Sequence, residues 1–402
     1  MRLIVFSVRN IGRNKRRSLA VLALIALGST ALLLAGGYAA ANFTGLRERT
    51  IRNGVGHLQL SAATHAGIEA TLADGLTDHD GLRRIVLRDS RVKAATARVD
   101  FTGLASTGEE SVAVIGRGIE PDQEYERAGF IPTMVEGRPV AIGQESEALV
   151  AAGLARSLKL RPGDRLTLMS ATVDGAINGI DTTVVGIYTT GIRELDERSV
   201  VVRLDTAQAL LATSRVSRLV VVLHDTDQTR ALEAALAQQV GTGIRIRTWS
   251  ELATFYHQVR SLYSGIFGFL GIIITVLVVL SAGNAMTMTV MERVREIGTL
   301  MAVGTTRVRI MAMFVVEGLA LGTIGGTLGL VLGYTLARLL TAADIQMPPP
   351  PTFTTGFPLE IEVVPGLYAA VLVVMVLTLG AAALLPAIRA ARLRITDALG
   401  HV

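Results

Sequence analysis

The sequence predicts a membrane protein with four transmembrane α-helices and one large α+β extracytoplasmic domain. Hydrophobic residues make up 50% of the 402 residues, charged residues only 18%, and the mean hydropathy is +0.47. An ordinary soluble domain does not reach this balance, so much of the apolar surface must be buried in lipid. Four long apolar stretches carry the excess, whereas residues 46–260 contain no stretch long and apolar enough to cross a bilayer.

The first apolar stretch, residues 19–38, consists almost wholly of Ala, Leu, Ile, Val and Gly, and no charge lies between Arg17 and Arg47. At about 1.5 Å per residue, such a helix crosses the ~30 Å hydrocarbon core. A secretory signal peptide has an apolar core of only about 7 to 15 residues, so we favour a retained anchor over a cleaved signal. The other predicted spans are residues 261–291, 310–337 and 363–388, in which Glu317 is the only charged residue.

The distribution of Lys and Arg beside these spans predicts the orientation. Three flanking segments are basic, namely Arg2, Arg9, Arg13, Lys15, Arg16 and Arg17; Arg293, Arg295, Arg307 and Arg309; and Arg389, Arg392 and Arg394. Residues 341–365 contain neither Lys nor Arg. Because cytoplasmic loops are enriched in Lys and Arg, we expect a multi-pass membrane protein with both termini in the cytoplasm. The net charge of +5 therefore reflects topology and does not indicate nucleic acid, while a further role of the N-terminal cluster on anionic lipid stays open.

Three segments follow from this layout: residues 1–45 with the first span, the extracytoplasmic domain 46–260, and residues 261–402 with three spans and the tail. The extracytoplasmic domain alternates β-like and helix-like runs, which predicts a mixed α+β fold. The predicted strands are 56–61, 98–104, 111–115, 165–168, 182–188, 199–203 and 218–223, and the predicted helices are 80–89, 147–158, 205–213 and 227–240. Turns are expected at Pro162-Gly163 and at Asp174-Gly175, the second within a hairpin.

The end of this domain predicts a rigid connection to the second span. Thr248-Trp249-Ser250-Glu251 fits a capping box, in which the Thr hydroxyl and the Glu carboxylate bond free backbone donors at a helix start. Neither Pro nor a loop cluster follows before Arg295, so we favour a helix that begins outside the membrane as a stalk. The alternative is a short surface helix followed by a break near Ser264-Gly265.

Residue patterns for catalysis and for cofactor binding are absent from the sequence. The six histidines show no metal-ligand spacing, and the chain has no cysteine for a thiol zinc site or a disulfide. No GxxxxGK[ST] phosphate loop occurs, and no nucleophile and base stand at a supporting spacing. We therefore predict no catalytic residue, no metal and no bound cofactor in this chain, so any energy must come from another one.

The third span carries two features. Its glycines recur every three or four residues, which allows another helix to approach closely, within the chain or in a second copy; they are Gly318, Gly322, Gly325, Gly326, Gly329 and Gly333. Glu317 is an acidic residue inside a span, and an ionisable residue at such a position often has a functional role. We favour the plainer interpretation that Glu317 pairs with an Arg near the cytoplasmic face. Four spans enclose too little for a conduit, so a dimer is expected.

Two neighbouring segments carry a family signature. They are Met291-Glu292-Arg293-Val294-Arg295-Glu296-Ile297-Gly298-Thr299-Leu300-Met301-Ala302-Val303-Gly304-Thr305-Thr306-Arg307 and Phe314-Val315-Val316-Glu317-Gly318 with the glycines after it. Together they resemble the signature of FtsX-type ABC transporter permeases. Gly118-Ile119-Glu120-Pro121, Pro162-Gly163-Asp164 and residues 190–196 resemble the periplasmic domain of MacB and of the lipoprotein-releasing permeases LolC and LolE. These similarities cover nearly the whole chain, and its layout is most similar to LolC and LolE.

This resemblance implies a homodimer or heterodimer of permeases with two cytoplasmic ATPase subunits, which bind the ATP and Mg²⁺. It also implies that the segment after the second span docks on the ATPase, through Glu292, Arg293, Arg295, Glu296, Gly298, Gly304 and Arg307. ATP-driven closure would then move the stalks and outer domains, as a mechanical device more than a channel. Unlike MacB, the sequence contains no fused ATPase domain.

The leading functional interpretation is extraction of a lipoprotein or lipid from the inner membrane, with a periplasmic carrier as a further partner. The alternatives are efflux of a small hydrophobic compound or peptide, as in MacB, and transmission of motion to a cell-wall hydrolase without transport, as in FtsX. In LolC a proline-containing hook recruits the carrier, but residues 170–181 here are short and proline-free, so capture at that loop is not expected. Pro348, Pro349, Pro350 and Pro351 form a stiff segment that either docks a partner or spaces two spans.

Overall fold

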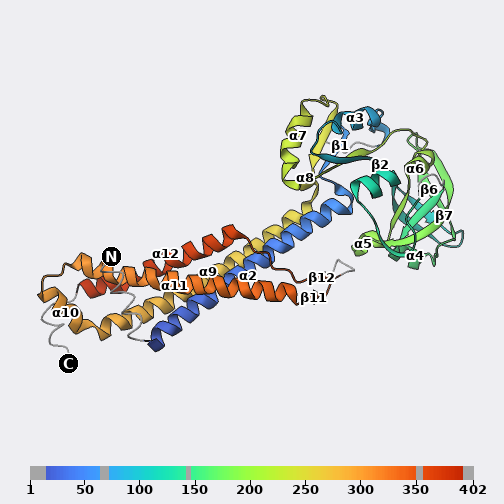
Figure 1. Ribbon diagram of the computed structural model, residues 1–402. Coiled ribbons are helices and arrows are strands. Elements are labelled where there is room, and N and C mark those ends of the chain that lie inside the picture. Colours follow the sequence, from blue (N-terminus) through green and yellow to red (C-terminus); the bar gives the residue numbers. More distant parts are fainter. Residues whose placement is uncertain (1–14, 64–71, 142–145, 350–355, 393–402) are drawn as a thin grey trace. The chain divides into compact units, whose positions relative to one another are not determined.

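The computed structural model describes residues 15–63, 72–141, 146–349 and 356–392, which form two compact units (Figure 1). The membrane unit contains the described parts of residues 1–44, 258–347 and 358–402. The sheet domain contains the described parts of residues 45–257 and 348–357. Each unit has its own apolar core, so each is described by itself.

Long apolar helices build the membrane unit. Four described helices are long and apolar enough to cross a membrane, and each contains one predicted span. They are α2 (Lys15–Thr50), α9 (Thr254–Glu292), α11 (Arg307–Ala342) and α12 (Pro365–Ala391). The short helix α10 (Val294–Ala302) connects the second to the third. Between α11 and α12 the chain forms the short strands β11 (Gln346–Met347) and β12 (Phe357–Pro358).

The core of the membrane unit lies where α2, α9, α11 and α12 face one another. Ile25, Met375, Leu379 and Ala383 are fully buried there. α9 has the smallest buried share of the four, so most of its apolar side chains point away from the other helices of this chain. Lipid or another helix therefore has to cover that surface.

Helix α9 begins later than the capping box predicted and contains no break near Ser264-Gly265. The capping-box residues form the short helix α8 (Trp249–Leu252), in which the Thr248 hydroxyl accepts a hydrogen bond from the Glu251 N–H at 3.3 Å. The chain then leaves helical geometry at Ala253 (φ −90°, ψ 59°), and α9 runs without interruption from Thr254 to Glu292. The break thus precedes the apolar stretch and is not near Ser264-Gly265, because glycine is tolerated inside transmembrane helices. With 39 residues, α9 is about 58 Å long, nearly twice the hydrocarbon thickness.

The sheet domain is built on one ten-stranded sheet, with strand order β10-β1-β9-β2-β3-β8-β5-β7-β4 and β6 paired to β2 and β7. Only the pairs β3/β8 and β5/β7 are parallel among the described strands. The strands are β1 (Leu58–Ala62), β2 (Val92–Ser106), β3 (Ser111–Ile119), β4 (Thr133–Gly137), β5 (Glu147–Ala151), β6 (Arg165–Ala171), β7 (Ile177–Thr189), β8 (Ser199–Arg203), β9 (Arg218–Leu223) and β10 (Ile244–Thr248). This α+β architecture with four apolar helices confirms the predicted fold class.

Strand β2 joins the two halves of this sheet. Its first half, Val92 to Arg98, pairs with β9, and its second half, Val99 to Ser106, pairs with β3. The α-helices of the sheet domain are α3 (His79–Val86), α4 (Ala152–Ser157), α5 (Arg193–Asp196), α6 (Leu204–Leu210) and α7 (Thr229–Ala237). Its π-helical turns are η1 (Ile51–Val55) and η3 (Asp122–Ala128), and its 3₁₀ turns are η2 (Leu72–Asp74) and η4 (Thr226–Gln228). One apolar cluster extends under both halves, so the domain has a continuous core.

The seven predicted strands are confirmed, while β4, β5 and β10 were not predicted. The predicted helix 147–158 is wrong in its first half, which is strand β5, and only Ala152–Ser157 is helical. All five residues of β5 are buried between β7 and β8, and a continuous apolar run does not distinguish a buried strand from a helix. Both predicted turns are confirmed: Gly163 (φ +103°) follows Pro162, and Gly175 (φ +85°) lies at the tip of the β6–β7 hairpin.

Candidate functional site

The connection from α9 to α11 presents one face inward and one face to the surface. Val294, Ile297 and Gly298 of α10 are buried, and Ile297 belongs to a cluster with Phe314 and Ala387. Glu292, Arg295, Glu296, Gly304 and Arg307 are exposed, while Arg293 is half-buried. Five of the seven residues predicted to dock an ATPase thus lie at the surface, and Gly298 instead packs inside the unit.

Two exposed apolar side chains flank this polar surface, and sequence reasoning missed both. Val303, next to the turn at Gly304 (φ +94°), is 83% exposed, and Val308 in the first turn of α11 is 74% exposed. The signal was present in the sequence, because both lie between Arg295 and Arg309, outside the predicted spans. The exposed surface of the connection therefore combines both charge signs with two aliphatic contacts, a composition suited to a protein partner.

Glu317, the acid inside the third long helix, has an arginine partner. Arg293 Nη1 lies 3.8 Å from Glu317 Oε2, and each side chain is 12% exposed. Arg293 sits at the break between α9 and α10, so the ion pair fastens that break to α11. This geometry agrees with the plainer interpretation of Glu317, since a charge inside a span needs a partner.

The six glycines of α11 lie in two rows that face different helices. Gly318, Gly322 and Gly326 contact α12, and Gly325, Gly329 and Gly333 contact α2. At Gly329 an added Cβ would come within 2.4 Å of the Ser29 Cβ and 2.8 Å of the Ala26 carbonyl oxygen. The Thr30 hydroxyl also donates to the Gly329 carbonyl at 3.1 Å. The glycines thus serve helix contacts inside this chain, which answers the question that the sequence left open.

The proline segment between α11 and α12 is described only in part. Pro348 and Pro349 are exposed, whereas Pro350 and Pro351 lie outside the described residues. The chain on either side is held close to the helices: the Tyr38 hydroxyl lies 3.5 Å from the Met347 sulfur, and the Glu362 N–H donates to the Gly37 carbonyl at 3.1 Å. The exposed prolines thus stand between two fixed ends.

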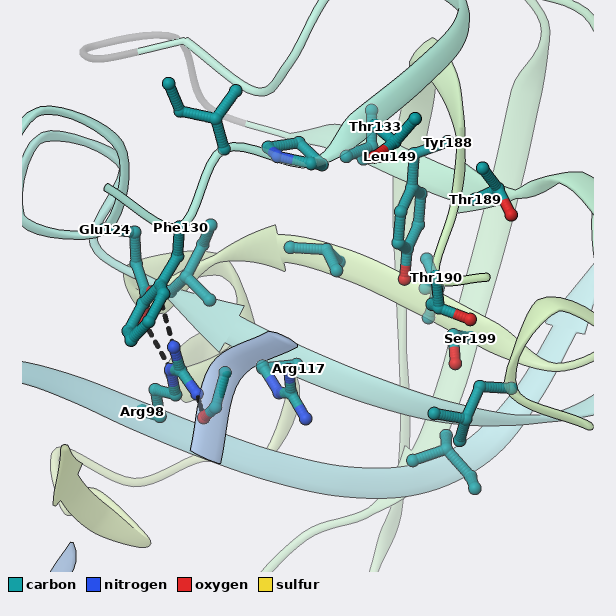
Figure 2. Close-up of a pocket in the computed structure, with 18 of the residues that line it drawn as sticks. Arg98, Arg117, Glu124, Phe130, Thr133, Leu149, Tyr188, Thr189, Thr190 and Ser199 are labelled. Carbon is teal, nitrogen blue, oxygen red and sulfur yellow. Dashed lines mark hydrogen bonds and ion pairs between the residues drawn. The ribbon is translucent and has the colours of Figure 1, made fainter. Parts of the chain in front are cut away.

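A cavity of about 200 Å³ lies within the sheet domain and was not predicted (Figure 2). It is lined by parts of β2, β3, β5, β7 and β8, by residues 124–133 and by the end of η1. Figure 2 shows the Arg98–Glu124 ion pair on one side, Tyr188, Thr190 and Ser199 on the other, and Arg117 between them. No group of three or more potential metal ligands occurs in the described part of the chain.

Comparison with known families places these features. The MacB-like periplasmic core domain family matches residues 18–239, more than half of the chain, and the FtsX-like permease C-terminal family matches residues 268–395. The chain belongs to the FtsX/MacB-type permeases of ABC transporters. This permease is therefore a multi-pass membrane protein, and its sheet domain corresponds to the MacB-like core.

Individual proteins are similar to different shares of this chain. The lipoprotein-releasing system transmembrane protein LolC of Xylella fastidiosa (strain Temecula1 / ATCC 700964) is 26% identical over 375 residues, which cover 86% of each chain. The macrolide export ATP-binding/permease protein MacB of Hyphomonas neptunium is 29% identical over 136 residues, 33% of this chain and 21% of that protein. The crystal structure of the extracellular domain of the ABC-type transporter YknZ from Gram-positive bacteria covers 48% of this permease and 99% of that domain, with 15% identity and a TM-score of 0.36.

Proposed function

We propose that this permease couples ATP hydrolysis by a separate cytoplasmic ATPase chain to the extraction of a lipoprotein or lipid from the bacterial inner membrane. The observation that carries the proposal is the relation to the lipoprotein-releasing protein LolC, which extends over 86% of both chains. Both termini are cytoplasmic in this proposal, because the basic segments flank the spans on that side. The sheet domain is then periplasmic.

In the proposed function, the permease and the ATPase chain have separate tasks. The permease supplies no catalytic residue, and ATP and Mg²⁺ bind to the partner ATPase, which docks on the exposed face of α10 and the turn at Gly304. A second permease copy, identical or related, covers part of the exposed surface of α9. The further partners are membrane lipid, a lipoprotein and a periplasmic carrier.

The β6–β7 hairpin sets a limit on how such a carrier binds. Ser170 pairs with Asn178 and Ala171 with Ile177, so the two strands continue almost to the turn at Gly175. This tight hairpin leaves no protruding proline-containing hook. In the proposed function the carrier therefore contacts another surface, for which the exposed Pro348 and Pro349 are available.

A second candidate function is efflux of a small hydrophobic compound or peptide. It is favoured by the match of more than half of the chain to the MacB-like core domain. Transmission of motion to a cell-wall hydrolase without transport is the remaining alternative. The three functions require different molecules on the periplasmic side, namely a carrier with its lipoprotein, an export adaptor, or a hydrolase.

The experiment that tests the proposal is purification of the permease with its co-expressed ATPase, followed by mass spectrometry of everything that remains bound. We expect an acylated protein or a defined lipid in near-stoichiometric amount. An adaptor or a hydrolase in place of lipidated cargo would favour efflux or transmission of motion. Failure to retain any ATPase would contradict the central claim.

Charge reversal locates the ATPase contact in the same preparation. We expect the double variant Arg295→Glu with Arg307→Glu to lose the ATPase, because both side chains lie on the exposed face of the connection. The matched control is Arg165→Glu, an exposed arginine on strand β6 of the sheet domain, which should retain the ATPase in full. Equal retention by the variant and the control would place the ATPase elsewhere.

A further inference from the structure

The sheet-domain cavity combines unbalanced positive charge, buried hydroxyls and exposed apolar side chains. We infer that it is a binding site for a small organic anion, a carboxylate or phosphate ester with an apolar body. Arg117 holds the anionic group, and the apolar body lies on Ile115, Ile131 and Leu195. The inference is independent of the proposed transport function, because it concerns the sheet domain alone.

Arg98 has a structural role at this site. Its guanidinium donates to Glu124 Oε2 at 2.6 Å, and each of these side chains is only 3% exposed. The Phe130 ring lies 5.0 Å from the guanidinium carbon, and another nitrogen donates to the Gly54 carbonyl. Glu124 balances its charge, so Arg98 forms part of the wall and is not a free anion receptor.

Arg117 differs from Arg98 because it shares its carboxylate. Its Nε lies 3.4 Å from Asp100 Oδ1, and Arg218 also pairs with Asp100. Two guanidinium groups thus share one carboxylate. The residues that line the cavity include three arginines, Arg52, Arg98 and Arg117, and two acids, Asp100 and Glu124, which leaves one excess positive charge. The Arg117 side chain is 42% exposed, so a ligand can reach its terminal nitrogens. Arg52 lies at the end of the cavity formed by η1 and is exposed, so its guanidinium group is also accessible to an anion.

Hydroxyl groups supply hydrogen bonds next to these charges. The Tyr188 hydroxyl bonds to Ser199, and burial raises the pKa of Tyr188 to about 12, so the phenol stays protonated at neutral pH. The Tyr125 hydroxyl is buried and has no hydrogen-bond partner among the described residues. A buried donor without a partner costs free energy, and a ligand oxygen at this place would satisfy it.

The apolar part of the proposed ligand follows from exposed side chains at the cavity. Seven large hydrophobic residues of the described sheet domain are exposed; they are Leu87, Leu104, Ile115, Ile131, Val135, Ile177 and Leu195. Three of these, Ile115, Ile131 and Leu195, line this one cavity. The side chain of Ile131 is 71% exposed. Clustering of exposed apolar side chains beside a few convergent polar groups is the usual composition of a small-molecule site.

The test uses the full chain in phosphatidylcholine nanodiscs, with calorimetric titration of n-hexyl phosphate, inorganic phosphate and hexanol. We expect saturable binding of hexyl phosphate that exceeds both fragments. No saturable heat up to about 10 mM hexyl phosphate would overturn the proposal. Hexanol binding as tightly as hexyl phosphate would also overturn it, and equal binding of inorganic phosphate would refute the apolar part.

Two variants and a control assign the site. Arg117→Gln should weaken hexyl phosphate binding about tenfold to hundredfold, since it removes a charged hydrogen-bond donor. Arg165→Gln, the exposed arginine on β6, should leave binding unchanged. If Arg117→Gln does not fold, Ile131→Glu decides, because this exposed position tolerates the change while the new charge repels the anion. Unaltered affinity in the folded variants would exclude this cavity.

Exchange of the nanodisc lipid distinguishes the possible sources of the ligand. If the natural ligand is an anionic lipid, phosphatidylglycerol in the disc should compete with hexyl phosphate and lower its apparent affinity. If it is a soluble amphiphile, the affinity for hexyl phosphate should be the same with either lipid. The anionic disc surface repels hexyl phosphate and inorganic phosphate alike, and salt screens this weak repulsion.

Discussion

Different physical effects stabilise the sheet domain and the membrane unit of this permease. In the sheet domain, Leu58, Leu60 and Leu219 are fully buried, and each such side chain contributes about 1.5–3 kcal/mol by leaving water. In the membrane unit, the helices would meet lipid as apolar as themselves, so burial alone gives little. There the glycines of α11 bring backbones together. The core of the sheet domain therefore depends on large buried side chains, whereas the core of the membrane unit depends on glycines, which have no side chain.

Buried charge marks the same difference. The sheet domain buries the Arg98–Glu124 pair at the junction of its two half-sheets, with further bonds from Thr96 and to Gly54. The Arg293–Glu317 pair of the membrane unit is 3.8 Å apart and lies at a helix break. A polar cluster inside a water-soluble fold stabilises only while every member keeps its partners, so the sheet domain should respond most strongly to its loss.

The largest effect is expected from Arg98→Met, which leaves Glu124 buried without its cation. We expect a loss of about 3–5 kcal/mol in the free energy of unfolding of the sheet domain. Trp249, the only tryptophan, lies in this unit and packs against Tyr256 at 5.2 Å, so its fluorescence reports the unfolding. Arg165→Met at an exposed position should change it by less than about 0.5 kcal/mol. A comparable loss in both variants would contradict the special role of the buried pair.

Gly329→Ala tests the membrane unit in the same way. The added methyl meets the Ser29 Cβ and the Ala26 carbonyl, so we expect a loss of about 1–3 kcal/mol by overpacking. Helical circular dichroism in detergent measures it, while the Trp249 transition should stay in place. Gly268→Ala in α9, where no atom lies within 4 Å of the new Cβ, should be neutral or slightly stabilising. Equal effects at both glycines would mean that close approach does not stabilise the unit.

Acid should weaken the sheet domain through His57. Its Nδ1 accepts from the Leu223 N–H at 3.1 Å, its Nε2 lies 3.0 Å from the Thr226 hydroxyl, and burial lowers the pKa of His57 to about 4. The unfolded chain therefore takes up a proton near pH 6.5 that the folded domain resists. The free energy of unfolding should be highest above pH 6.5, fall by about 1–3 kcal/mol on acidification, and level off below about pH 4.

Trp249 fluorescence in urea, measured between pH 4 and 8, gives this dependence. His57→Gln should flatten the slope, because the titrating group is gone. His224→Gln, an exposed position next to the same strand, should retain it. A slope that persists in His57→Gln would assign the acid sensitivity to other groups.

The smallest effect is expected at the helix cap that precedes α9. Thr248→Ala removes the acceptor for the Glu251 N–H, which should cost about 1 kcal/mol in unfolding followed by Trp249. The exposed Thr242→Ala is the matched control and should change stability by less than about 0.5 kcal/mol. No difference between the two would show that the cap contributes nothing.

The sequence predicts the membrane unit better than the sheet domain because lipid imposes a simple rule. A span must be long, apolar and helical, so all four could be located from composition alone. Strand β5 could not, since residues 148–151 are a short apolar run next to a helix, and only the burial of Glu147–Ala151 between β7 and β8 makes it a strand. The pairing of Glu317 with an arginine was predictable because a charge in lipid needs a partner.

The partners of the α11 glycines and the sheet-domain cavity required coordinates. Spacing shows that Gly329 permits close approach, but not that Ser29 and Ala26 occupy the space. The cavity gathers Arg117, Tyr125, Ile131, Tyr188 and Leu195 from separate elements, and none of them stands in a motif. The clearest feature of the cavity in the sequence is Ile131, an isoleucine followed by a proline. This pair of residues is too common to identify a site.

The end of α2 and the start of α9 belong to the sheet domain, where different hydrogen bonds hold them. α2 continues without interruption into the π-helical turn η1, whose Gly54 carbonyl is gripped by Arg98 at the centre of the sheet. α9 instead follows Ala253, a single residue outside helical geometry, whose N–H donates to the Trp249 carbonyl at 2.9 Å and whose carbonyl accepts from the His257 N–H at 3.3 Å. Rotation about Ala253 would break these two bonds, so α8 and the first turn of α9 should move as one piece.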